Sequence, residues 1–119
     1  MFEFQSLEVY KKAVLFHLNC KLILGKLKLE KYVNDQLARA SYSIVLNIAE
    51  GCAKSNKADR KNYFTTSRGS VFECVAILDI MHQCKDLDEA SYLDNLSLAD
   101  ELSRMLYKMI TNLSNLKGS

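Results

Sequence analysis

Apolar residues recur along this chain at the spacings of three and four positions that are typical of amphipathic helices. Four separate segments carry the pattern, covering about residues 6–24, 34–52, 57–85 and 89–116. The chain has no proline and only four glycines, so little interrupts these segments. The pattern predicts an all-α protein with four long helices.

Residues that favour helix ends separate the four segments. Asn34, Asn56 and Asp88 are good N-caps for the second, third and fourth helices, and Gly25 is expected to end the first. The apolar rows predicted to face the core are Leu7, Tyr10, Val14, Leu18 and Leu22; Tyr63, Phe64, Val71, Val75, Leu78 and Met81; and Leu93, Leu96, Leu102, Met105, Leu106, Ile110 and Leu113.

The second segment is apolar on nearly every side, which predicts burial on more than one face. In a protein of this size we expect the second buried face to meet another subunit. The connections are short and therefore favour antiparallel neighbours. We predict one domain over residues 1–119, an antiparallel up-down-up-down four-helix bundle.

Polar and charged residues interrupt two of the helices where leucine or alanine would be ordinary. Because such groups are costly to bury unpaired, we expect them to form a polar seam between the second and third helices. The small Gly69 suggests a close helix approach. A register-setting network is the favoured interpretation, and a ligand or catalytic site is the alternative. The seam consists of Arg39, Ser43, Asn47, Glu50, Arg68, Gly69, Ser70 and Glu73.

Composition restricts the class of protein. The chain is 49% hydrophobic and 25% charged, as in ordinary globular proteins, and no apolar run approaches the roughly 20 residues that span a bilayer. The N-terminal segment does not resemble a secretory signal, so a cytoplasmic location is expected. The four cysteines lack a CxxC pair and are predicted to be small buried residues: Cys20, Cys52, Cys74 and Cys84.

A basic cluster lies between the second and third helices. Lys54, Lys57, Arg60 and Lys61 fall within eight residues and are followed by Tyr63. Cations beside an aromatic ring can hold a phosphate backbone and stack a base. A solvated helix start is the simpler interpretation for one chain. Repetition around an oligomer would add several such clusters into one positive surface.

The residues give little support for catalysis or for a cofactor. His17 and His82 fall on different predicted helices, and no serine or cysteine has the context of a nucleophile. Di-iron bundles use two Glu-x-x-His pairs, whereas the chain has one similar pair, Asp79-x-x-His82. We therefore expect neither enzymatic activity nor a bound metal or cofactor.

Three stretches resemble the 23S rRNA-intervening-sequence proteins, also called S23 ribosomal proteins. They are the Phe4-x-x-Leu7-x-Val9-Tyr10 segment, the Asn47-Ile48-Ala49-Glu50-Gly51 segment, and Arg68-Gly69-Ser70-x-x-Glu73. The chain departs from the family at Val45-Leu46, where relatives often have proline, and at Ser67, where they often have alanine. A less kinked second helix is therefore expected.

The resemblance implies an antiparallel four-helix bundle that assembles into a homopentamer, without established enzymatic activity. It also implies a relation to accessory proteins of diversity-generating retroelements, which bind nucleic acid and a reverse transcriptase. We expect an RNA- or DNA-associated binding protein whose phosphate contacts are Lys54, Lys57, Arg60 and Lys61. A scaffold for a protein partner, such as a polymerase or reverse transcriptase, is the alternative.

Overall fold

The computed structural model describes residues 1–115 and contains four long helices after one short turn of 3-10 helix. The elements are η1 (Glu3–Ser6), α1 (Glu8–Lys26), α2 (Lys31–Ala53), α3 (Lys57–Gln83) and α4 (Glu89–Asn115). The predicted all-α four-helix bundle is confirmed. None of the helices in this described part is both long and apolar enough to span a membrane.

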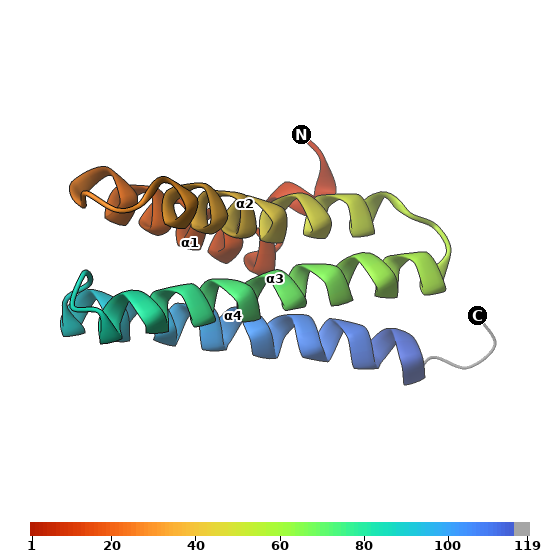
Figure 1. Ribbon diagram of the computed structural model, residues 1–119. Coiled ribbons are helices and arrows are strands. Elements are labelled where there is room, and N and C mark those ends of the chain that lie inside the picture. Colours follow the sequence, from red (N-terminus) through yellow and green to blue (C-terminus); the bar gives the residue numbers. More distant parts are fainter. Residues whose placement is uncertain (116–119) are drawn as a thin grey trace.

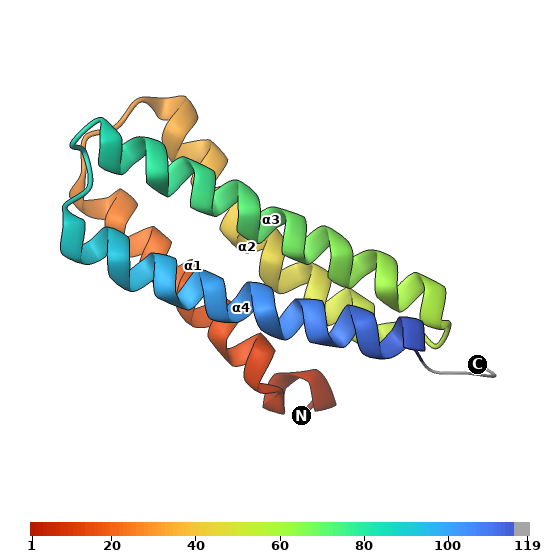
Figure 2. The ribbon, with the colours of Figure 1, turned by 90° about the horizontal axis from the view of Figure 1, so that it is seen from below.

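The helices pack as an elongated antiparallel bundle measuring 51 × 27 × 22 Å (Figure 1). Each helix contacts two neighbours, in the cyclic order α1, α2, α3, α4. The α1–α2 and α3–α4 connections share one end of the bundle, whereas the α2–α3 turn forms the other end (Figures 1 and 2). The short η1 folds against α1 and α2 on the side of the α2–α3 turn.

The predicted helix ends are correct where a side chain makes the capping bond. The backbone N–H of Asp59 donates to the Asn56 side chain at 3.1 Å, and that of Ser91 donates to Asp88 at 2.8 Å. Two predictions are wrong. Asn34 lies inside α2, which begins at Lys31, and α1 continues through Gly25 to Lys26.

The extra turn of α2 follows from tertiary packing. Leu29 and Val33 pack against the core on either side of the helix start, so burial extends the helix beyond its best local cap. Asn34 consequently loses its capping role, and its side-chain oxygen is buried without a hydrogen-bond partner among the described residues.

The inward face of α1 differs from the predicted one. The residues that it buries are Val9, Ala13, Phe16, Cys20 and Ile23. Leu18 and Leu22, which were predicted to face the core, are 51% and 62% exposed. Together with the half-exposed Leu15 they form an outward apolar row, the leucine stripe. In α4, Leu93 is also exposed, whereas Leu102 and Leu106 are buried as predicted.

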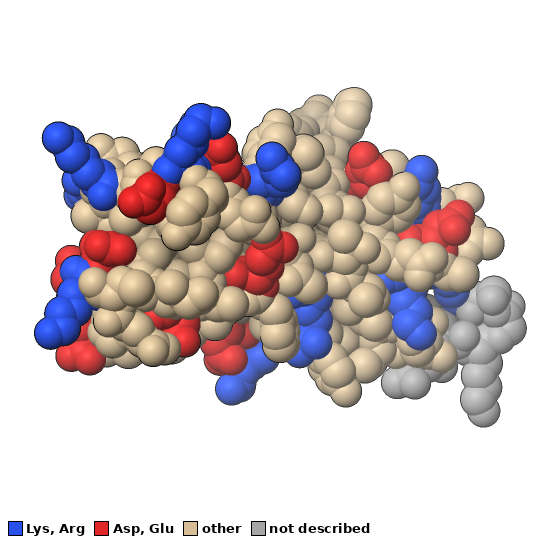
Figure 3. All heavy atoms as spheres, viewed as in Figure 1, with Lys and Arg blue, Asp and Glu red and all other residues tan. Residues whose placement is uncertain are grey.

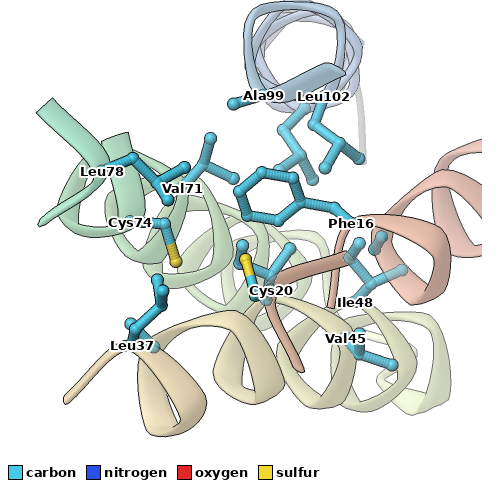
Figure 4. Close-up of a cluster of buried hydrophobic side chains, with 14 of the residues drawn as sticks. Phe16, Cys20, Leu37, Val45, Ile48, Val71, Cys74, Leu78, Ala99 and Leu102 are labelled. Carbon is cyan, nitrogen blue, oxygen red and sulfur yellow. The ribbon is translucent and has the colours of Figure 1, made fainter. Parts of the chain in front are cut away.

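The core is built around Phe16 of α1, which points into the space between α1, α3 and α4 (Figure 4). Cys20 and Cys74 place their sulfur atoms in the same interior, as predicted, and both are free thiols. Burial raises the pKa of Cys20 to about 12 and also raises that of Cys74, so both thiols stay protonated and pack as small apolar groups.

The other two cysteines do not belong to this core. Cys52 is only half-buried. The prediction of burial is wrong for Cys84, which is exposed immediately after the end of α3.

The glycine that α2 and α3 need where they pack is Gly51, not Gly69. A methyl group at Gly51 would come within 2.5 Å of the Phe64 ring, which is itself fully buried. Gly69 faces outward, and a methyl group there would meet nothing within 4 Å. The expectation that Gly69 allows close helix packing is therefore wrong within this chain, whereas Gly51 leaves room for the Phe64 ring of α3.

These two glycines give a matched pair of alanine variants. Gly51→Ala should lower the free energy of unfolding by about 1–3 kcal/mol because the added methyl group would force the buried Phe64 ring to shift. Gly69→Ala should raise it by about 0.5–1 kcal/mol because an exposed helix position gains helix propensity. Urea denaturation followed by circular dichroism measures both values. Equal effects of the two substitutions would contradict the assigned packing.

Candidate functional site

The polar seam forms in part, along the contact between α2 and α3. The hydroxyl oxygens of Ser43 and Ser70 lie 3.0 Å apart, across the two helices. Asn47 donates to the Ser43 carbonyl oxygen at 2.9 Å and to its hydroxyl at 3.0 Å. These bonds satisfy half-buried polar groups and fix the relative register of two helices.

Ser67 was not among the predicted seam residues, although it makes the most deeply buried bond of the seam. Its side chain is completely buried and donates to the Ile44 carbonyl oxygen of α2 at 2.8 Å. Its spacing from Phe64, Val71 and Cys74 puts it on the core face of α3, a pattern visible in the sequence.

The charged members of the predicted seam differ in what they contact. Glu73 accepts a hydrogen bond from Gln36 of α2 at the exposed edge of the contact. Arg68 does not pair with Glu73: it donates through Nε to the Ser103 carbonyl oxygen of α4 at 3.1 Å. Arg39 and Glu50 are exposed on α2, and neither makes an ion pair within residues 1–115. The seam is thus a row of small neutral side chains.

Two aromatic rings hold the Arg68 side chain in place. Its guanidinium carbon lies 4.9 Å from the centre of the Phe72 ring and 5.2 Å from that of Tyr107. Both distances are within the range of cation–π attraction. Arg68 therefore joins α3 to α4 rather than α3 to α2.

The four predicted cations of the α2–α3 turn gather at one end of the bundle. We call Lys54, Lys57, Arg60 and Lys61 the basic tip. Two of them lie against aromatic rings, since the Lys54 ammonium is 5.3 Å from the Tyr63 ring centre and the Arg60 guanidinium carbon is 5.9 Å from that of Phe64. Such contacts orient the cations without neutralising them.

No carboxylate forms an ion pair with the basic tip within the described residues. Residues 50–61 contain these four cations and two acidic residues, Glu50 and Asp59. At the opposite end, residues 26–31 and 84–89 together carry basic and acidic groups in equal number. Figure 3 shows both kinds of group interleaved at this end. The basic tip is therefore the end with the uncompensated positive charge.

Both histidines are engaged within the bundle. The Nδ1 atom of His17 lies 2.8 Å from the Ser41 hydroxyl, and burial followed by the nearby Lys21 charge lowers the pKa of His17. The His82 ring stacks on Tyr92 with 4.3 Å between ring centres, while the Tyr92 hydroxyl donates to Asp79. In the part of the chain that the structure describes, no three metal-binding side chains come close enough to hold an ion.

A double-mutant cycle tests the seam. Ser43→Ala and Ser70→Ala should each lower the free energy of unfolding by about 0.5–1.5 kcal/mol, and together by less than the sum, because they share one hydrogen bond. Ser43→Ala combined with Ser97→Ala, at an exposed position of α4, should be additive. Additivity in both pairs, measured by urea denaturation, would show that the two hydroxyls do not interact.

A solved structure has the same architecture. It is the 1.70 Å crystal structure of a protein of unknown function from the S23 ribosomal protein family of Bacteroides thetaiotaomicron VPI-5482. Its TM-score to this chain is 0.80 at 20% sequence identity, and the match covers 86% of this chain and 97% of that one. At this identity the similarity establishes the shared fold. A comparison with curated proteins found no match.

The sequence itself matches the model of one protein family. The match to the 23S rRNA-intervening sequence proteins extends over residues 5–108 and therefore includes α1, α2, α3 and most of α4. It contains the seam, the basic tip and the core residues described above. The chain belongs to the 23S rRNA-intervening sequence protein family.

Proposed function

We propose that this chain is a non-catalytic, self-assembling protein that binds RNA through its basic tip. The observation that carries the proposal is the concentration of unneutralised cations at the α2–α3 turn. Contacts of lysine and arginine with phosphates supply most of the affinity in sequence-independent nucleic-acid binding. The family description refers to 23S rRNA, and this supports RNA rather than another polyanion.

The local backbone strengthens the positive potential of the tip. The helix α3 begins at Lys57 with its first turn capped by Asn56, so the positive end of a 27-residue helix coincides with the cationic side chains. Lys57 and Lys61 are spaced to lie on neighbouring turns, near the start of this helix. Phosphate oxygens are the partners that both the side chains and the helix terminus favour.

Self-assembly is supported by apolar surface that the bundle leaves uncovered. All three members of the leucine stripe face outward along α1. Tyr42 and Leu46 of α2 are also exposed, and the Tyr42 ring lies 5.4 Å from the His17 ring of α1. Apolar rows of this kind on neighbouring helices mark protein–protein contacts. A second copy of the chain is the proposed occupant, in a pentamer as the family resemblance implies.

Assembly would strengthen RNA binding because it repeats the basic tip around a symmetry axis. One tip offers four cations, and several tips engaging one RNA would act multivalently. The alternative function, a scaffold for a polymerase or another protein, is favoured by the same apolar surface. The two functions differ in what covers the leucine stripe.

Neutralising two lysines tests the RNA proposal. Lys57→Gln with Lys61→Gln should weaken binding to a fluorescein-labelled RNA hairpin. It should also reduce the slope of log K against log salt by roughly 0.7–0.9 for each phosphate that the variant no longer neutralises. The matched control is Lys26→Gln with Lys28→Gln at the opposite end, which should change neither. Anisotropy titrations at about 50 and 200 mM salt measure both quantities. Wild-type affinity that is indifferent to salt would refute the proposal.

Polar substitution of the leucine stripe tests self-assembly. Wild type should scatter light with a multiple of the 13.6 kDa chain mass, and Leu18→Gln with Leu22→Gln should reduce that mass towards one chain because both side chains are outside the core. Leu93→Gln, at a similarly exposed leucine of α4, should leave the mass unchanged. A wild-type mass of one chain would contradict self-assembly and favour the scaffold alternative.

A further inference from the structure

An open hollow lies beside the basic tip, between η1 and the end of α2. Its volume is about 560 Å³, within the range of about 300–1,000 Å³ that is usual for pockets that hold small organic groups. Ala49, Cys52 and Ala53 of α2 line it with small side chains. Phe2 and Phe4 contribute aromatic rings, and the other lining residues are Glu3, Leu7 and Arg60 of the basic tip.

The aromatic side of this hollow is ordered. The Phe4 ring packs edge-on against Tyr10 of α1, with 4.9 Å between ring centres, and the Phe2 ring lies 6.0 Å from Phe4. The backbone N–H of Phe2 donates to the Gln5 side chain at 2.8 Å, which closes the turn. Phe2 nevertheless remains 73% exposed, so the bundle holds an aromatic ring in place without covering it.

The cationic side of the hollow lacks a counterion among the described residues. Arg60 forms no ion pair there, and its Nε–H is buried without an acceptor. The Arg60 charge also acts on Cys52: burial raises the pKa of that thiol, and Arg60 partly opposes the increase. Glu3 is the acidic residue among those that line the hollow, and it makes no ion pair with Arg60.

A ligand that fits this site has a flat apolar part that stacks on the aromatic side and an anionic part that pairs with Arg60 on the cationic side. A nucleobase can stack on the exposed Phe2 ring, and its phosphate can reach Arg60 and the neighbouring lysines of the basic tip. A paired base inside a duplex is not available for stacking on a protein side chain, whereas an unpaired base is. The Lys54 ammonium lies over the Tyr63 ring, whereas the Phe2 ring beside the tip is exposed. Phe2 is therefore the better placed of the two rings for stacking.

We propose that the hollow between η1 and α2 holds an unpaired nucleobase stacked on Phe2, with its phosphate at Arg60, so that the chain selects single-stranded or looped RNA over duplex. This inference rests on the proposed RNA-binding function and specifies its substrate class. It assigns the stacking role to Phe2 rather than to Tyr63, and it makes Glu3 a residue that weakens binding by repelling the phosphate.

The test uses the full chain and two RNA hairpins of equal length. One hairpin carries 2-aminopurine unpaired in its loop, and the other carries it paired in the stem. Binding of wild type should quench the loop probe by stacking and should leave the stem probe unchanged. Phe2→Ala should abolish this quenching and weaken affinity for the loop by roughly 5- to 100-fold, the range expected when one base–aromatic stack is removed.

Two further variants control the experiment. Tyr32→Ala removes an aromatic ring that is equally exposed, 73%, at the opposite end of the bundle, and should behave as wild type. Glu3→Gln should strengthen binding to both hairpins, because it removes a negative charge beside Arg60. Thermal melting followed by circular dichroism should show that Phe2→Ala is folded, since the ring lies outside the core.

The outcomes separate this inference from the proposed function. Quenching of the loop probe that persists in Phe2→Ala, or wild-type quenching of the stem probe as strong as that of the loop probe, overturns the stacking site while RNA binding by the basic tip stands. Absence of wild-type binding to either hairpin at low salt overturns both. A Phe2→Ala variant that binds the hairpins with wild-type affinity also refutes the stacking role of Phe2.

Discussion

The close contact between α2 and α3 is the constraint on which the rest of this structure depends. Gly51 lies directly against the Phe64 ring, and the Ser67 hydroxyl reaches the Ile44 carbonyl oxygen on the backbone of α2. Only small side chains permit two helices to approach so closely. The contact continues to the last turn of α2, and the chain reverses within three residues, which places Lys54 of the turn beside the cations at the start of α3.

Stability and proposed binding therefore use adjoining parts of the same helix pair. The seam bonds are made by neutral groups, whose burial is far less costly than that of charges. The charged residues Arg39 and Glu50, by contrast, stay on the surface of α2. Arg68 is the exception, and its two aromatic contacts and one backbone bond explain how a half-buried cation is accommodated. The basic tip has aromatic contacts at Lys54 and Arg60 but no ion pair within the described residues, so it is suited to an external anion.

Helix number and the helix ends with side-chain caps are predicted well by local sequence patterns, whereas the side of each helix that faces the core is predicted less well. Asn56 and Asp88 cap their helices as the sequence indicates because each capping bond is local. The facing of α1 was mispredicted because that helix has two apolar rows, and spacing alone does not reveal which row meets the core. The sequence does not show whether Gly51 or Gly69 faces a neighbouring helix. The position of the Phe64 ring shows that Gly51 is the one where a larger side chain does not fit. The hollow beside η1 was not predictable, since it joins residues almost sixty positions apart.

The two apolar rows of α1 also allow an alternative packing of this helix that competes with the native one during folding. Rotation of α1 by half a turn would bury Leu15, Leu18 and Leu22 and release Phe16, exchanging one hydrophobic gain for another. The native rotation is distinguished by fit and by one directional bond, since Ala13 and Cys20 match a narrow interior and His17 reaches Ser41 at 2.8 Å. Two competing apolar rows are a form of local frustration, so the rotation of α1 depends on what surrounds the helix. Burial of the leucine stripe in an assembly would then stabilise the rotation of α1 in which the stripe faces outward. Assembly would in this way favour the native packing of the whole helix.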